Sequence, residues 1–368
     1  MRARWPRVLA VGAAPLVVAG TLSAAAVGRT GAPAYGIVAV RAASPAGAAA
    51  AGHTVAAGHI AAAGHIAAAG PFATLLFSRT EMTAADNCVP DNTGIATLDK
   101  VAPFLHSLGM AGTGTLITGK TGQTTRHCSH RNESLNASWA DATHLADTFG
   151  WSFVSHTATY PNNWSTLTPA QLRAETCGSA DTIASHGLPG AHGLIAYPGA
   201  AGVPKQVQAD YSAKCFAWGR RYVKTGTTLQ SAGTTPPYWQ HTEAVSGGSC
   251  NAPAASCYTT PRGFRYSTPD QIIAHVAALR PGQWFTLEAF VLVTGTNPPY
   301  TTNRTRWDCT SPNPKLHWSN DNERYCYSDW QKIVRAIAAR PDVTVTDPLT
   351  VGVAFGRPAT YPNSRTRS

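Results

Sequence analysis

The chain has 368 residues, of which 13% are charged and 43% are hydrophobic, and its formal net charge is +10. This length allows one large domain with a single core. A basic chain suggests nucleic acid as a partner, but the charged fraction is low and the arginines are scattered, so we exclude nucleic acid and expect an anionic cell-wall or glycan surface.

Residues 1–26 have the three parts of a secretory signal peptide. Three arginines precede the apolar run 8–18, and small residues follow at 22–26, where a signal peptidase could cleave. A permanent membrane anchor is the alternative, but the apolar run is short and rich in Ala and Gly. We therefore expect a secreted, cell-wall associated protein with no stable membrane span after signal cleavage.

Residues 27–70 form a low-complexity linker of Ala, Gly and His. Its hexad repeat places His53, His59 and His65 six residues apart, which is the period of neither a helix face nor a regular metal clip. Weak metal scavenging is one hypothesis, and a flexible tether is the favoured one. The globular domain is predicted over 71–356 and a polar tail over 357–368.

Within the domain, apolar runs of strand length alternate with segments of helical periodicity. Capping signatures at Thr168 and Thr268 mark two helix starts. Such alternation is typical of a parallel sheet covered by helices, and the segments 222–266 and 294–326 are predicted loops. The predicted strands are 72–78, 112–118, 151–157, 193–199, 215–220, 283–293 and 343–347, and the predicted helices are 95–109, 137–150, 168–186, 204–214, 268–279 and 328–340.

Either an open doubly wound sheet or a closed barrel fits this order, and two observations favour the barrel. No Gly-rich phosphate-binding turn follows the first strand. Polar residues lie at the C-terminal ends of several strands, where such barrels place their sites. These residues are Ser78, Arg79, Thr118, His156, Tyr197, Arg220 and Glu288.

The chain contains eight cysteines and no C-x-x-C motif. An even number in an exported chain favours disulfides over zinc or redox chemistry, although sequence does not determine the connectivity. The expected pairs are Cys250–Cys257, Cys309–Cys326, Cys177–Cys215 and Cys88–Cys128.

Over most of residues 72–350 the chain resembles the polysaccharide deacetylase (NodB-homology) superfamily. The resemblance implies a distorted (β/α)7 barrel that hydrolyses the amide C–N bonds of N-acetylated polysaccharide or cell-wall glycan. It also implies a divalent metal, usually zinc, which polarises the carbonyl and activates water. The similar stretches are FLHSLGMAGTGTLITGK (104–120), HTATYP (156–161, for the family's H-x-x-x-H-P), LTPAQLRAE (167–175), IAYPGA (195–200) and GQWFTLEAFVL (282–292).

The chain departs from the family's catalytic pattern at several positions. Ser78 and Arg79 stand where the family has its two aspartates, one a general base and the other a metal ligand. His156 corresponds to the first metal histidine, Tyr160 replaces the second, and Glu288 falls near the late general-acid histidine. One imidazole does not hold zinc. The resemblance therefore implies either an altered metal site or an inactive barrel that binds cell-wall carbohydrate.

Other residues of the chain could rebuild the site. Glu81 and Glu288 are the candidate catalytic residues, and His156 and Asp86 are the candidate metal ligands. Several alternatives stay open: Glu81 and Asp86 as solvated loop residues, Glu288 as a core-facing ion-pair member, and a glycosidase whose carboxylates are Glu81 and Glu288, for which their distance would decide. The substrate-binding candidates are Arg79, which attracts anions, Tyr160, whose ring can stack on a sugar, Tyr197 and Pro198.

Overall fold

The chain divides into two compact units, Met1–His59 and Ile60–Ser368, and every residue described below lies in the second. A computed structural model describes residues 70–77, 98–122, 124–126, 133–135, 137–161, 163–198, 203–220, 229–231, 243–244, 258–259, 265–289, 291–296, 308–313, 317–319 and 324–361. The predicted signal peptide and nearly all of the predicted linker lie outside these residues, so these two domain assignments stay predictions.

The main element is a nine-stranded sheet in the order β7-β6-β5-β2-β1-β12-β8, with β16 beside β1 and β9 beside β12. All neighbouring strands pair in parallel except β8, which is antiparallel to β12. The predicted fold class, a parallel sheet with surrounding helices, is confirmed. The strands are β1 (Phe72–Phe77), β2 (Thr113–Leu116), β5 (Ser152–Ser155), β6 (Leu194–Ala196), β7 (Trp218–Arg220), β8 (Leu229–Ser231), β9 (Glu243–Ala244), β12 (Gln283–Ala289) and β16 (Thr344–Val345).

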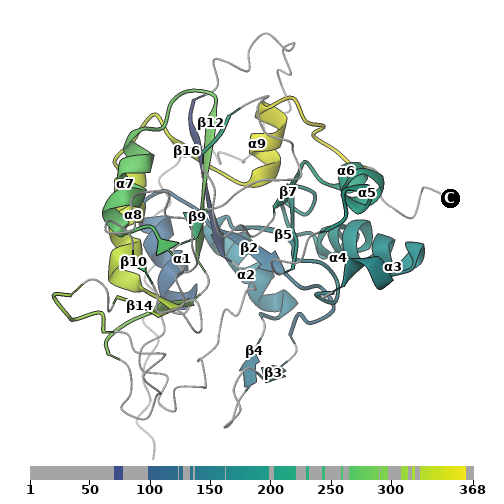
Figure 1. The fold of residues 1–368 in the computed structure, drawn as a ribbon, viewed down its shortest axis with the longest axis horizontal. Coiled ribbons are helices and arrows are strands. Elements are labelled where there is room, and N and C mark those ends of the chain that lie inside the picture. The colour runs from purple at the N-terminus through teal and green to yellow at the C-terminus, as the bar shows by residue number, and fades with distance from the viewer. Residues whose placement is uncertain are drawn as a thin grey trace, which may run out of the picture. The chain divides into compact units, whose positions relative to one another are not determined.

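Helices connect the strands and cover the sheet (Figure 1). Helices α7 and α8 pack against each other, with α1 beside them, and α3 to α6 cover the sheet near β6 and β7. No helix among the described residues has the length and apolarity needed to cross a membrane. The helices are α1 (Leu98–Ser107), α2 (Trp139–Phe149), α3 (Pro169–Arg173), α4 (Ser179–Ser185), α5 (Lys205–Val207), α6 (Ala213–Cys215), α7 (Pro269–Ala277), α8 (Tyr327–Ala338) and α9 (Pro348–Ala354), with π-turns at Ala174–Gly178 and Gln208–Ser212 and a 3₁₀ turn at Trp164–Thr166.

Local sequence signals explain where several helices begin and end. Both predicted capping boxes form, because the side chains of Thr168 and Thr268 accept hydrogen bonds from the third helical N–H of α3 and α7. Helix α2 ends at Gly150, whose φ of 69° is a left-handed conformation that glycine adopts without steric cost.

The sheet curls until its two distant strands β7 and β12 meet through side chains. In the strand order these strands are five spacings apart, which in a flat sheet would separate them by about 24 Å. Yet the rings of Trp218 and Trp284 have centroids 5.0 Å apart, and Arg220 forms an ion pair with Glu288. A parallel sheet curled in this way is a half-barrel, which is consistent with the predicted (β/α)7 barrel; among the described residues the end strands β7 and β8 do not pair.

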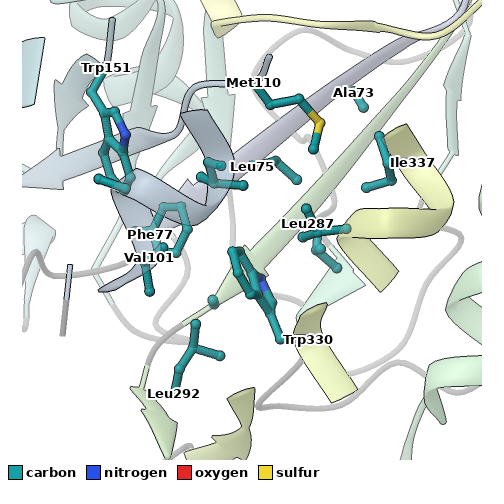
Figure 2. Close-up of a cluster of buried hydrophobic side chains, with 14 of the residues drawn as sticks. Ala73, Leu75, Phe77, Val101, Met110, Trp151, Leu287, Leu292, Trp330 and Ile337 are labelled. Atoms are coloured by element: carbon teal, nitrogen blue, oxygen red, sulfur yellow. The ribbon is translucent and has the colours of Figure 1, made fainter. Parts of the chain in front are cut away.

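The two faces of the curled sheet bury different side chains. On the outer face, alternate residues of β1 pack against α1 and α8, and the ring of Phe77 lies 4.8 Å from that of Trp151 and 5.8 Å from that of Trp330, centroid to centroid (Figure 2). We call the apolar group on the other face the inner cluster. It comprises Phe72, Leu76, Val154, Leu194, Ala196, Ala217, Trp218, Trp284 and Val351.

Two of the four predicted disulfides are confirmed. Cys177 pairs with Cys215, and Cys309 pairs with Cys326. The other four cysteines, and thus the predicted pairs Cys88–Cys128 and Cys250–Cys257, lie outside the described residues.

The prediction of a single strand over 283–293 is wrong. Strand β12 ends at Ala289, and β13 (Val291–Val293) pairs with β15 (Arg324–Cys326) in a separate sheet that also contains β14 (Trp318–Ser319). A run of apolar residues shows that a segment is buried, but it does not show which strand the segment pairs with. The sequence therefore does not reveal where the chain passes from one sheet to another.

Other elements were not predicted at all. Helix α9 begins at Asp347, whose carboxylate accepts hydrogen bonds from the N–H groups of Leu349 and Thr350. Short strands also occur within the predicted loops and turns: β8, β9, β3 (Thr124–Arg126), β4 (Glu133–Leu135), β10 (Tyr258–Thr259) and β11 (Arg265–Tyr266).

Candidate functional site

The candidate site lies at the C-terminal ends of β5, β6, β7 and β12, on the inner face of the barrel. Ser155 pairs with Ile195, and Ala196 pairs with Arg220. Residues two apart on a strand share a face, so His156 faces inward like Val154, and Arg220 like Trp218. His156, Ala196 and Arg220 therefore form a row across three neighbouring strands, with the small side chain of Ala196 in the middle.

His156 is held in a defined orientation. Its backbone N–H continues the β5 ladder by donating to the carbonyl of Leu116 at 2.8 Å. The residue is 3% exposed, and Nδ1 of its ring lies 2.6 Å from the carbonyl oxygen of Ala196. A carbonyl only accepts hydrogen bonds, so Nδ1 carries the hydrogen, and the lone pair of the neutral ring is on Nε2. Nε2 is therefore the atom that could accept a proton or bind a metal.

Glu288 and Arg220 form an ion pair inside the barrel, and their side chains are 0% and 2% exposed. Buried charges of this kind are stable only when paired, because each loses its hydration on folding. Glu288 is thus an ion-pair member, one of the two roles that the sequence left open. A catalytic role for Glu288 stays a prediction.

Tyr160 lies beside His156 at the rim. The two rings meet edge to face with centroids 5.0 Å apart, and Lys120 Nζ is 5.6 Å from the centroid of the Tyr160 ring. Both Tyr160 and Lys120 are half-buried. An aromatic ring next to a cation offers a stacking surface and a positive charge. The substrate-binding role of Tyr160 stays a prediction.

Tyr197 and Pro198 follow β6 and are buried. The side chain of Tyr197 is 1% exposed and packs edge to face against Trp164, on the outer side of the sheet. The backbone N–H of Tyr197 donates to the carbonyl of Arg220, which joins it to the row described above. Substrate contact by these two residues stays a prediction.

Arg79, Glu81 and Asp86 lie outside the described residues, so the structure does not place them. Among the residues that it does describe, no group of three or more His, Cys, Asp and Glu side chains is arranged to hold a metal ion. Zinc needs at least three protein ligands. The described residues thus do not fit a zinc site on their own, and we derive no step through a metal.

Sequence reasoning missed Glu175, which lies in the π-turn after α3 and contacts the loop that follows His156. Its carboxylate is buried, with 5% of the residue exposed. The stretch LTPAQLRAE contains it, but a glutamate on a helix usually faces solvent, and no pattern showed that this one faces the loop.

Among the solved structures similar to this chain is the family 4 carbohydrate esterase from Streptomyces lividans in complex with acetate, which is 12% identical, with a TM-score of 0.35, over 76% of this chain and 95% of that one. The Bc1960 peptidoglycan N-acetylglucosamine deacetylase is 10% identical, with a TM-score of 0.35, over 78% of this chain and 89% of that one. IcaB from Ammonifex degensii is 13% identical, with a TM-score of 0.26, over 39% of this chain and 80% of that one.

These solved structures are in line with the predicted resemblance to polysaccharide deacetylases, but at TM-scores of 0.26–0.35 they carry no argument about the fold, which rests on this chain's own strand order. At such low identities and TM-scores the likeness carries no information about chemistry, which must come from the residues of this chain. No protein-family model matches the chain, and no curated protein matches it.

Proposed function

We propose that this chain is a secreted, polysaccharide deacetylase-like hydrolase that acts on the N-acetyl groups of cell-wall glycan. The observation that carries the proposal is His156, whose Nδ1–H donates to the Ala196 carbonyl and so puts the lone pair on Nε2, at the strand ends of a barrel. Hydrolysis needs a group that takes a proton from water and returns it to the departing amine, and an oriented imidazole performs both transfers.

The surroundings of His156 support a glycan as the substrate. The ring of Tyr160 can stack on a sugar, and the ammonium of Lys120 lies beside that ring. The net charge of +10 favours anionic polymers such as those of a cell wall. In an alternative form of the proposal, Nε2 of His156 binds a divalent metal together with Asp86, and Glu81 takes over the proton transfer as the catalytic carboxylate.

A second candidate function is carbohydrate binding without catalysis. Glu288 favours it, since a carboxylate that is fully buried and ion-paired with Arg220 is poorly suited to exchange protons with a substrate. The described residues also lack a three-ligand metal group. In this reading the barrel keeps the rim residues Tyr160 and Lys120 as its binding surface.

One experiment separates the two functions. Purified protein is incubated with N-acetylglucosamine oligomers; the acetate released is measured, and the Kd for the same oligomers is obtained by calorimetry. The hydrolase predicts acetate release that falls at least about 100-fold in His156→Ala. If the altered metal site forms, the purified protein should also hold about one divalent ion per chain. Binding without acetate release and without metal would establish the second function, and absence of both binding and release would refute both.

A further inference from the structure

We infer that Glu175 is a positioning residue: its buried carboxylate holds the loop 156–160 in the conformation that aims His156 and Tyr160 at the barrel mouth. The inference rests on the proposed function in so far as these two side chains handle the glycan. It concerns how they are held in place, which no motif of the sequence indicated.

The loop 156–160 contains two residues in an unfavourable backbone conformation, which contacts with the rest of the protein must maintain. Thr157 has a φ of 70° and Tyr160 a φ of 66°, and they are the non-glycine residues with positive φ among the described part of the chain. Left-handed backbone is unfavourable for ordinary side chains, and a β-branched residue such as threonine is a true outlier there. Strain of this kind persists only where the surroundings impose it, and it clusters at functional sites.

The Glu175 carboxylate supplies the strongest of these constraints. Oε2 accepts hydrogen bonds of 2.9 Å from the backbone N–H groups of both Ala158 and Thr159, and Oε1 accepts one of 2.5 Å from the Thr159 hydroxyl. A carboxylate is an acceptor only, and three donors converge on it in a setting where 5% of Glu175 is exposed. Charge-assisted bonds of this type are about twice as strong as neutral ones.

Further hydrogen bonds complete the hold on the loop. The Thr157 N–H donates to Ser155 Oγ, and the Tyr160 N–H donates to Thr157 Oγ1, each at 3.0 Å. Ser155 Oγ in turn lies 2.5 Å from the hydroxyl of Ser179, which is four residues beyond Glu175 on the same helical segment. This segment is therefore hydrogen-bonded to the loop directly through Glu175 and indirectly through Ser155, the last residue of β5.

The position of Glu175 within a π-turn fits such a role. The π-turn Ala174–Gly178 lies between α3 and α4 and changes the helical phase of the residues within it. Isolated π-turns inside helices are frequent at functional sites. On the other side of the loop, the N–H of Gly119 donates to the carbonyl of Ala158 at 2.8 Å, so the turn that follows β2 is also bonded to the loop.

The consequence concerns the two rings. His156 directly precedes the strained Thr157, and the Tyr160 ring meets it edge to face at 5.0 Å. Without the carboxylate, Thr157 and Tyr160 can relax to negative φ. The Tyr160 ring then leaves the edge of His156, and the imidazole loses its fixed direction.

The test is the variant Glu175→Gln in the full-length protein, with Asp147→Asn as the matched control. Both exchange a carboxylate for an amide, but Asp147 lies exposed on α2. The amide of the introduced glutamine has one acceptor oxygen and one NH₂ group, and an NH₂ group cannot accept a hydrogen bond from the loop. The variant therefore cannot accept all three bonds. The direct readout is the NOE between the His156 and Tyr160 rings in protein labelled at His and Tyr, assigned with His156→Gln and Tyr160→Phe.

We expect the ring–ring NOE to disappear in Glu175→Gln and to persist in Asp147→Asn. Acetate release should fall at least about ten-fold in Glu175→Gln while the circular dichroism spectrum stays that of the wild type. An unchanged NOE together with an unchanged Kd and turnover would overturn the inference. If the wild type neither binds nor hydrolyses the glycan, the proposed function fails, and the NOE still decides the role of Glu175.

A milder variant keeps the test decisive if Glu175→Gln does not fold. Thr159→Val removes only the hydroxyl bond to Oε1 and leaves both backbone bonds in place. It should weaken the NOE without abolishing it and lower turnover two- to three-fold. A Thr159→Val protein identical to the wild type in both readouts would count against the inference.

Discussion

Strands β7 and β12 contribute side chains to both ends of the barrel interior, and these side chains are apolar at one end and charged at the other. Near the N-terminal ends, β7 and β12 contribute Trp218 and Trp284, whose rings are in contact within the inner cluster. Two residues further along β7 and four along β12, the contact is the ion pair of Arg220 and Glu288. In β/α barrels the N-terminal end generally provides stability and the C-terminal end the chemistry, and the site that we propose lies at the charged, C-terminal end of these strands.

The comparison predicts the largest loss of stability at the apolar end. Trp284 is fully buried, and its indole N–H donates to the hydroxyl of Thr74 at 3.0 Å. We expect Trp284→Ala to lower the free energy of unfolding by about 3–5 kcal/mol, because a large cavity remains. Urea unfolding followed by circular dichroism measures it. Trp284→Phe is the control and should lose clearly less; equal losses in both variants would contradict the cavity explanation.

At the polar end, removal of one charge should also be costly, but removal of both should not. Arg220→Met leaves Glu288 buried without its partner, and the free energy of unfolding should fall by about 3–5 kcal/mol. The double variant Arg220→Met/Glu288→Leu should recover most of that loss, since two apolar side chains of similar volume need no pairing. A double-mutant cycle in urea gives the coupling energy, and simple additivity would show that the two side chains are not energetically coupled.

At the rim we expect an effect on binding with little effect on stability. Tyr160 is half-buried, and removing its ring in Tyr160→Ala should weaken glycan binding about ten-fold, as loss of about 1.4 kcal/mol of stacking would do. Calorimetry with N-acetylglucosamine oligomers measures the Kd. Tyr160→Phe keeps the ring and should bind within two- to three-fold of the wild type. A loss of affinity in both variants would assign the effect to the hydroxyl.

The smallest expected effect is at Lys120. Its ammonium lies 5.6 Å from the centroid of the Tyr160 ring, and a partly exposed cation–π contact contributes about 0.5–1 kcal/mol. Because at most this energy helps to hold the Tyr160 ring in place for a glycan, Lys120→Met should reduce affinity no more than about two- to five-fold. For an anionic glycan, the salt dependence of Kd should also decrease. Lys120→Arg retains the charge and serves as the control, and an unchanged salt dependence in Lys120→Met would exclude a direct charge contact.

Much of the fold followed from the sequence because it is encoded locally. The apolar runs of β1, β2, β5, β6 and β7 and the capping boxes at Thr168 and Thr268 each depend on a few adjacent residues. Helix α9 was not predicted, because the cap at Asp347 was not recognised as a helix start. The end of β12 at Ala289 was not predicted either, because the residues that follow it pair with the distant strand β15.

The candidate site likewise contains residues that the sequence identified and residues that it did not. The motif HTATYP and the order of elements led to His156 and Tyr160, because a strand end is a local feature. The roles of Arg220 and Glu175 were not predictable, since one depends on a strand 68 residues away and the other on a loop 16 to 17 residues earlier in the chain.

By itself, the sequence of this protein determined most of the central strands and longer helices, because burial pattern and capping are properties of neighbouring residues. Only the tertiary structure decided which side chains share an environment. Curling of the sheet brings β7 against β12 and pairs two buried charges, and packing of a helical segment on the loop after β5 holds Thr157 and Tyr160 in backbone conformations that their own sequence disfavours. Such contacts arise between residues far apart in the chain, so their energy appears only when the fold is complete.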